Sequence, residues 1–292
     1  MQSRLYRGFP GPITLPRLAS PISVDPLRNV RILVAYDGSA FYGWQRQAGF
    51  ESVQEALEDA LFALTGDRIT VRGSGRTDTG VHAFGQVANF HVDTRLDDNR
   101  LWHALNAHLP EGASIRRLET CRDDFHAQYD ACGKRYVYLI RTHRYPLPFG
   151  RGFTHFVRDP LHLAAMREAA ALLVGTHDFR AFSNTGSPRK SSVRRITSIR
   201  LIPRRESLAI VVSGTGFLYR MVRVIAGTLL KVGRDKMSAE DVRAVLLSKD
   251  RNLAGATAPA QGLYLLSVRY DEPLFRNQAD DPSGLPGVFP LS

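Results

Sequence analysis

A glycine-rich segment between two β-type runs constrains the fold of this chain more than any other feature. Residues 73–87 read GSGRTDTGVHAFGQV. The run before it, 69–73, and the run at its end, 87–92, have the β-branched and apolar pattern of strands. The segment is therefore predicted to be a connection at the end of a sheet, where glycine permits positive φ and close approach of a ligand to the backbone.

Asp78 places a carboxylate inside this connection, two residues after Arg76. A P-loop is excluded because Val81 and His82 stand where the phosphate-binding lysine and the magnesium-binding hydroxyl would be. A dinucleotide fingerprint is excluded because Asp78 occupies the place of its third glycine. Asp78 is interpreted as a catalytic or binding carboxylate, and the alternative is an Asp/Arg pair that closes a turn.

The chain around this segment alternates strand and helix patterns. Further strands are expected at 31–36, 196–202, 208–214 and 263–270. Helices are expected after Ser52 with an end at Gly66, after Asp98 as far as Leu109, after Asp159-Pro160 as far as Gly175, over 218–232, and after Ser238 with Asp241. Two α/β parts that contain antiparallel hairpins predict an α+β fold rather than a doubly wound sheet.

The charge balance favours a nucleic-acid partner. Thirty-nine Lys and Arg against 28 Asp and Glu give a formal charge of +11 in 292 residues, as a phosphate-binding surface requires. A basic protein that is merely soluble remains an alternative, because total charge does not say where the basic residues cluster.

Other site classes lack their sequence signals. Cys121 and Cys132 form no CxxC motif, and the nine histidines show no metal-ligand spacing, so no metal site is expected. No run of about 18 apolar residues predicts a membrane span. Residues 1–26 are rich in proline and lack a continuous apolar core, so a flexible leader is expected rather than a signal peptide. The expected compartment is the cytoplasm, with reduced thiols.

Five segments together resemble one family. Residues 75–90, GRTDTGVHAFGQVANF, are similar to the signature loop of the tRNA pseudouridine synthase A (TruA) family, whose members modify the anticodon stem-loop. Four further segments resemble this family in the same order: YDGS with FYGWQ (36–39, 41–45), KRYVY (134–138), FLYRMVR (217–223), and ATAP with GLYL (256–259, 262–265). The resemblance extends from about residue 29 to about residue 272.

The resemblance implies a fold and an assembly. It implies two similar ferredoxin-like or RRM-like α/β halves with joined antiparallel sheets, a basic active-site cleft between them, and a homodimer that binds tRNA. The expected division is a leader at 1–28, an N-terminal domain at 29–124 with the aspartate loop, a C-terminal domain at 125–273, and a tail at 274–292. The basic strand 134–141 is expected near the junction.

The resemblance also implies an activity, which is isomerisation of uridine to pseudouridine at tRNA positions 38 to 40, without a cofactor. A uridine stacked in a stem has to be extruded before it can reach a carboxylate. By resemblance, Asp78 is the catalytic carboxylate and Arg223 is its cationic partner. The implied substrate-binding residues are Arg76 in the vacated space or on a phosphate, Tyr136 beside the base, and Leu263 against the base.

Each assignment has an alternative from the residues alone. Arg220 and Arg223 could lie on a solvated helix face, and Tyr136 could be an ordinary core or cross-strand aromatic. His82 is interpreted as a turn histidine that satisfies local hydrogen bonds. An RNA-binding module would explain the charge but lacks the RNP1 string, and a hydrolase would need a second carboxylate or a metal. The sequence does not choose between attack at C1′, attack at C6 and a glycal route.

Overall fold

The computed structural model describes residues 27–146, 148–184 and 191–275. Residues 1–26 of the predicted leader, residues 276–292 of the predicted tail, and the basic pair Arg189 and Lys190 lie outside the described residues.

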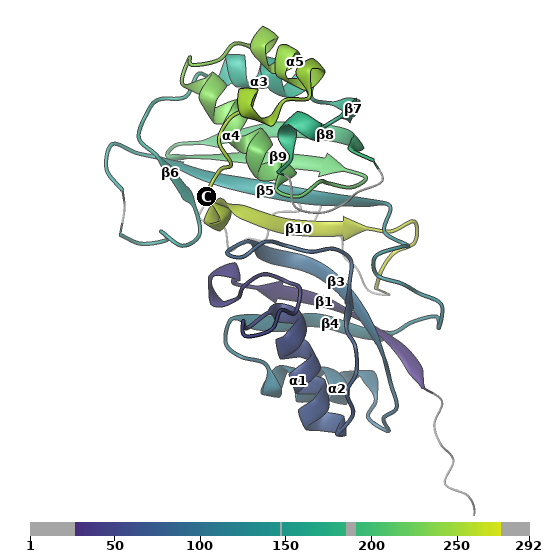
Figure 1. The fold of residues 1–292 in the computed structure, drawn as a ribbon. Coiled ribbons are helices and arrows are strands. Elements are labelled where there is room, and N and C mark those ends of the chain that lie inside the picture. Colours follow the sequence, from purple (N-terminus) through teal and green to yellow (C-terminus); the bar gives the residue numbers. More distant parts are fainter. Residues whose placement is uncertain (1–26, 147, 185–190, 276–292) are drawn as a thin grey trace, which may run out of the picture.

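Ten strands of the described residues form one sheet (Figure 1). They are β1 (Arg28–Tyr36), β2 (Arg72–Gly73), β3 (His82–Val92), β4 (Ala113–Thr120), β5 (Gly133–Thr142), β6 (His155–Val157), β7 (Gly175–Asp178), β8 (Val193–Arg204), β9 (Ser207–Gly214) and β10 (Leu263–Arg269). The main order is β4-β1-β3-β10-β5-β9-β8-β7, with β2 beside β3 and β6 beside β5. All pairings are antiparallel except β10 with β3 and β5 with β6. The mixed, largely antiparallel sheet confirms the predicted α+β class.

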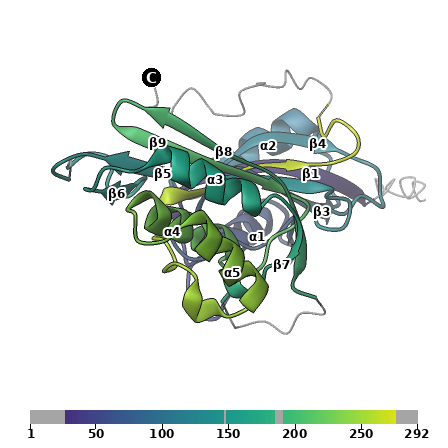
Figure 2. The same ribbon diagram turned by 90° about the horizontal axis from the view of Figure 1, so that it is seen from above.

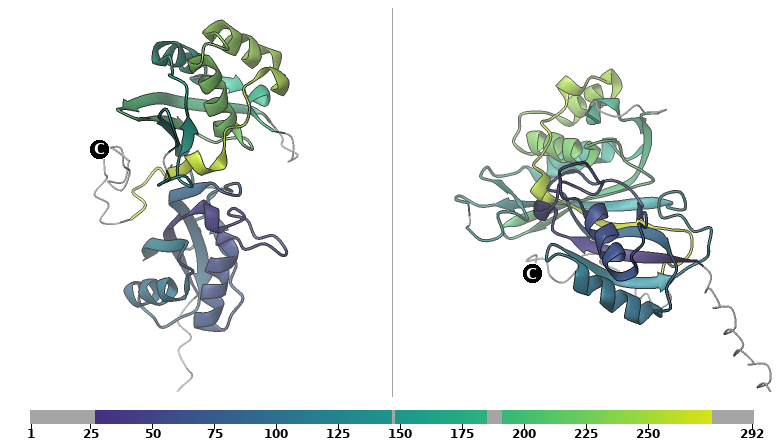
Figure 3. Two further views of the ribbon diagram at one scale, coloured as in Figure 1. Left: turned by 90° about the vertical axis from the view of Figure 1, so that its left-hand side faces the viewer. Right: turned by 60° about the horizontal axis from the view of Figure 1, so that its bottom comes forward.

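The helices form two groups, one at each end of the sheet (Figures 1 and 3). The α-helices are α1 (Val53–Thr65), α2 (Asp98–His108), α3 (Leu163–Leu172), α4 (Met221–Gly233) and α5 (Ala239–Ser248). Short 3-10 helices are η1 (Gly38–Ala40), η2 (Arg180–Phe182), η3 (Arg251–Leu253) and η4 (Ala260–Gly262). In Figure 2, α4 and α5 lie on one side of β8 and β9.

One continuous core joins both groups of helices to the same face of the sheet. Alternate residues of β1, such as Val30 and Ile32, belong to it together with Leu57 of α1. Ile210 of β9 and Ile225 of α4 lie in the same cluster. Because side chains alternate between the faces of a strand, this single cluster means that both helix groups cover one side.

Strand β10 joins the two ends of the sheet. Tyr264 pairs with His82 of β3, and Leu265 pairs with Tyr136 of β5. The predicted joining of the two sheets is thus made by the last strand of the described chain. The basic strand β5 lies next to it, near the junction, as the family resemblance implied.

Local signals set several helix ends. Ser52 accepts a hydrogen bond from the Glu55 amide at the start of α1, and Gly66 ends that helix with φ 79°. Ser238 and Asp241 form the predicted capping box of α5.

Other predicted boundaries were wrong. Asp97, rather than Asp98, caps α2 by accepting from the Arg100 amide. Asp98 instead accepts hydrogen bonds from Arg28 and Thr120, since its neighbour already satisfies the helix end. Helix α3 begins only at Leu163 and ends at Leu172.

Two more predicted elements start elsewhere along the chain. Helix α4 begins at Met221 rather than 218, because Arg220 adopts a left-handed conformation that interrupts the helical pattern. Of the run 69–73, only Arg72 and Gly73 pair with β3, while β3 itself already begins at His82.

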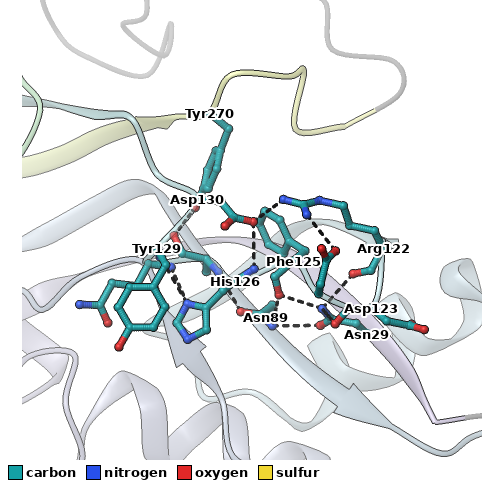
Figure 4. Close-up of polar contacts among 12 residues, drawn as sticks. Asn29, Asn89, Arg122, Asp123, Phe125, His126, Tyr129, Asp130 and Tyr270 are labelled. Carbon is teal, nitrogen blue, oxygen red and sulfur yellow. Dashed lines mark hydrogen bonds and ion pairs between the residues drawn. The ribbon is translucent and has the colours of Figure 1, made fainter.

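A buried amide cluster fixes the segment that follows β4 (Figure 4). Asn29 Nδ2 donates to the carbonyls of Arg122, Asp123 and Phe125, at 3.1, 3.1 and 2.9 Å. Asn89 Nδ2 donates to Asn29 Oδ1 at 2.9 Å. Both amide side chains are fully buried, so these bonds determine where the chain passes from β4 towards β5.

Candidate active site

The loop that carries Asp78 lies between β2 and β3 and is fixed from one side by the N-terminal half. The Ser74 amide donates to the Val87 carbonyl at 2.7 Å, and Gln86 Nε2 donates to the Gly75 carbonyl at 2.8 Å. Tyr36 and Thr77 share a hydroxyl hydrogen bond of 2.8 Å. These bonds leave the loop little freedom, so the position of Asp78 is determined by the sheet.

Arg223 on α4 approaches Asp78 from the C-terminal half. Its Nη1 donates to Asp78 Oδ2 at 3.1 Å, and its Nε donates to the Ala258 carbonyl at 2.7 Å. The two side chains are only 13% and 20% exposed, so water weakens this ion pair less than it would at the surface. Arg223 therefore does not lie on a solvated helix face, which was the alternative from the sequence.

The segment that orients Arg223 is packed directly against α4. The Ala258 amide donates to the Arg223 carbonyl at 3.1 Å. Gly227 is necessary for this contact, because a Cβ there would lie 1.8 Å from the Ala256 carbonyl oxygen. The ATAP segment of the sequence thus acts as a support for the arginine.

Arg220 is the second cation near Asp78. Its Nε lies 3.9 Å from Asp78 Oδ2, and its guanidinium lies 4.8 Å from the centre of the Tyr219 ring. Its backbone has φ 59°, an uncommon conformation for a residue with a side chain. Both guanidinium groups approach Oδ2, so Asp78 Oδ1 has no hydrogen bond from any residue that the structure describes.

Tyr136 lies on β5 near this carboxylate. Burial, and secondarily the negative charge of Asp78, raises the pKa of Tyr136 well above its usual range. The phenol is therefore neutral at physiological pH and can donate a proton in a hydrogen bond. Phe217 packs edge-on against its ring, with ring centres 5.2 Å apart.

Leu263 is buried and pairs with Tyr138, two residues along β5 from Tyr136. It faces the same side of the sheet as Tyr136, whose direct partner on β10 is Leu265. Asp78, Arg223 and Tyr136 are thus brought together, and Leu263 lies beside them in the core.

Arg76 points elsewhere. Its Nε donates to Gln45 Oε1 at 3.0 Å, and the residue is exposed. Within the described residues, the ion pairs of Asp78 are with Arg220 and Arg223, so the turn-closing Arg76–Asp78 pair is not formed. The FYGWQ motif, which supplies Gln45, therefore orients Arg76.

The prediction of a turn histidine with local hydrogen bonds was wrong, because His82 begins β3 and its ring nitrogens contact residues far away in the sequence. Nδ1 accepts from the Gly38 amide at 3.0 Å, and Nε2 lies 3.0 Å from the Gly152 carbonyl. Burial lowers the pKa of His82. The ring is therefore neutral near pH 7, and the nearby Asp37 carboxylate forms no ion pair with it there.

Sequence reasoning missed two supports of this loop, Gln86 and Lys134. Lys134 Nζ donates to the Ser74 carbonyl at 2.8 Å. The sequence did carry one signal for Lys134. It lies two residues before Tyr136 on one strand, and residues i and i+2 of a strand point to the same face of the sheet.

Two findings concern the described residues as a whole. Across the described ranges, no group of three His, Cys, Asp or Glu side chains could hold a metal ion. No helix in that part of the chain has the length and apolar character to cross a membrane.

The fold and site define a mixed α+β protein with a cation-paired carboxylate at the junction of two sheet halves. The model of the tRNA pseudouridine synthase family matches residues 32–130 and 169–271. The chain belongs to this family, and it is an isomerase that forms pseudouridine in tRNA.

Curated relatives agree over most of the chain. The tRNA pseudouridine synthase A of Acetivibrio thermocellus is 43% identical over 244 residues, which cover 84% of this chain and 100% of that protein. The protein of the same name from Shouchella clausii is 44% identical over 246 residues, covering 84% and 94%. That from Bacillus licheniformis is 43% identical over 245 residues, covering 83% and 99%.

Proposed function

We propose that the chain isomerises uridine in the anticodon stem-loop of tRNA, at positions 38 to 40, with Asp78 as the catalytic carboxylate. The observation that carries the proposal is the asymmetry of Asp78. Its Oδ2 accepts from Arg223 at 3.1 Å, whereas Oδ1 has no hydrogen bond among the described residues. One oxygen is thus held and balanced in charge, and the other is available to a substrate.

The reaction needs no redox partner and no water. The bond from C1′ of the ribose to N1 of uracil breaks, the base turns, and C5 bonds to C1′ while the C5 proton leaves and N1 gains a proton. A carboxylate can attack carbon as a nucleophile or accept the C5 proton. Attack at C1′, attack at C6 and a glycal route are all compatible with Oδ1 in this position.

Tyr136 is proposed to lie against the base. Its raised pKa keeps the hydroxyl protonated, so it can donate a hydrogen bond or relay a proton near C5, but it is no base in the resting enzyme. Leu263 is proposed to pack against the same base from β10.

Access to the carboxylate requires that the uridine leave its stack, at a cost of a few kcal/mol. Arg76 is exposed, and among the described residues its side chain is hydrogen bonded only through Nε, to Gln45. We propose that its remaining donors fill the vacated space or bind the phosphate of the flipped nucleotide.

The formal charge of +11 supports tRNA binding, and the family resemblance supports a homodimer in the cytoplasm. Gel filtration with light scattering should give twice the chain mass of 32.5 kDa. A monomer that is fully active at assay concentration would contradict the dimer.

The test of the function is tritium release from tRNA labelled at uridine C5, followed by a map of the pseudouridines formed. The wild-type protein should release tritium and place pseudouridine at positions 38 to 40. Tritium release with pseudouridine formed at other positions would support the activity but contradict modification at positions 38 to 40.

A further inference from the structure

Lys134 is an unusual residue for its position. It begins the KRYVY motif on β5, is half-buried, and has no ion pair within the described residues. Burial lowers the pKa of Lys134 to about 8, so the ammonium is held at some cost in solvation. A lysine in such a place requires a compensating role.

The ammonium lies in a space that Gly75 leaves open. Lys134 Nζ donates to the Ser74 carbonyl at 2.8 Å. A Cβ on Gly75 would lie 2.4 Å from Nζ, well inside contact distance. The glycine has no positive φ, so its backbone does not need glycine, whereas a side chain there would meet the ammonium.

This hydrogen bond connects the two halves of the sheet at the loop. The other hydrogen bonds of residues 74–77 within the described chain are with the N-terminal half, from Tyr36, Trp44, Gln45, Gln86 and Val87. Lys134 comes from β5, on the same strand face as Tyr136. One side chain therefore relates the loop of Asp78 to the strand of Tyr136.

We propose that Lys134 is a positioning residue of the reaction, which inserts beside Gly75 and holds the Ser74 carbonyl so that Asp78 and Tyr136 keep their relative places. The inference rests on the proposed function of Asp78. Within the described residues Lys134 forms no ion pair with Asp78, and it acts through its hydrogen bond to the loop.

Two variants remove the contact by independent means. Lys134→Met removes the donor and keeps an apolar stem. Gly75→Ala leaves the lysine in the sequence but displaces its ammonium, which is the end of a flexible side chain, so the backbone can stay. Lys236→Met is the matched control, because it removes one positive charge from an exposed lysine.

The measurements are the single-turnover rate at saturating tRNA, the dissociation constant for tRNA, and the thermal midpoint. Each variant should lower the rate by about 10- to 100-fold, as displacement of catalytic groups by about 1 Å can do. The dissociation constant should stay within about 3-fold. The double variant should be no slower than Lys134→Met alone, because both changes remove one contact.

Opposite outcomes are equally clear. A normal rate in Gly75→Ala, or losses that multiply in the double variant, would overturn the inference. A higher dissociation constant for tRNA, with a normal rate at saturating tRNA, would instead show that Lys134 binds RNA directly. If Lys134→Met fails to fold, Gly75→Ala carries the test alone.

Asp78→Asn separates this inference from the function on which it rests. If Asp78→Asn is inactive and both loop variants are fully active, only the positioning role fails. If Asp78→Asn retains turnover, the assignment of Asp78 fails, whatever the loop variants do.

Discussion

Two polar clusters of this molecule differ in how completely their atoms are hydrogen bonded. In the amide cluster of Asn29 and Asn89 (Figure 4), every side-chain oxygen and nitrogen has a partner. Asn89 Oδ1, for example, accepts from the Ala127 amide at 3.0 Å. At the Asp78 site, Asp78 Oδ1 and the buried Nε of Arg220 have no hydrogen-bond partner among the described residues.

The difference separates stability from chemistry. A buried polar group without a partner costs free energy, and the cluster of Asn29 and Asn89 avoids this cost for its side-chain atoms. The Asp78 site instead keeps donors and an acceptor available. We therefore expect changes in the first cluster to alter unfolding, and changes in the second to alter turnover.

The largest effect is expected for Asp78→Asn. The substitution keeps the shape of the side chain but removes its charge and its capacity to accept a proton, so turnover should fall by at least about 1000-fold. The tRNA dissociation constant and the thermal midpoint should change little. Substantial turnover by a preparation checked for deamidation back to Asp would remove Asp78 from the mechanism.

Arg223→Met should follow, with a loss of about 100- to 1000-fold in turnover, because the group 3.1 Å from the carboxylate is lost. Arg223→Lys should recover part of it. Lysine restores the charge but cannot donate to both Asp78 and the Ala258 carbonyl in the arginine geometry. If the lysine and methionine variants were equally impaired, geometry alone would be responsible.

Asn89→Ala should instead lower stability and leave turnover nearly unchanged. It leaves Asn29 Oδ1 and the Ala127 amide without their partner, so the free energy of unfolding should fall by about 1–3 kcal/mol. Turnover measured at a temperature well below the thermal midpoint should stay within about 2-fold of the wild-type value, since the cluster fixes no group at Asp78. Chemical denaturation and tritium release on the same preparation make the comparison, and a stable but inactive variant would break it.

The smallest effect is expected at His82, which lies near the site but has both nitrogens occupied. Its pKa is lowered in the folded protein by burial, so the unfolded chain takes up a proton first as the pH falls below about 6.5. Part of the stability present at neutral pH is therefore lost in acid. The His82→Gln variant should lose less stability than the wild type as the pH falls below that value, and its turnover at pH 7 should be normal. A steeper loss of stability in the variant would mean that His82 is charged in the folded protein.

The sequence predicted the fold where a local signal had a local cause. Ser52, Gly66 and the Ser238/Asp241 pair fix helix ends through bonds within a few residues, and these ends were correct. Adjacent Asp97 and Asp98 offered two equivalent caps, and only the tertiary contact with Arg28 decides between them.

For the site, the motifs indicated Asp78, Arg223 and Tyr136 but not what holds them. Contacts such as Lys134 with Ser74 join residues 60 positions apart, and no periodicity reports them. Arg220 was expected inside a regular helix that begins at 218, yet its left-handed backbone places the helix start at Met221. Such a conformation depends on the surrounding packing rather than on local propensity.

The position of β10 has a consequence for synthesis on the ribosome. Leu263–Arg269 is made after every other strand and helix described here, yet it is inserted between β3 and β5 in the middle of the sheet. Until this segment emerges, a nascent chain lacks the strand whose main-chain pairing joins β3 to β5. We therefore expect a chain that stops before Leu263 to be inactive on tRNA, because β3 and β5 are then not joined.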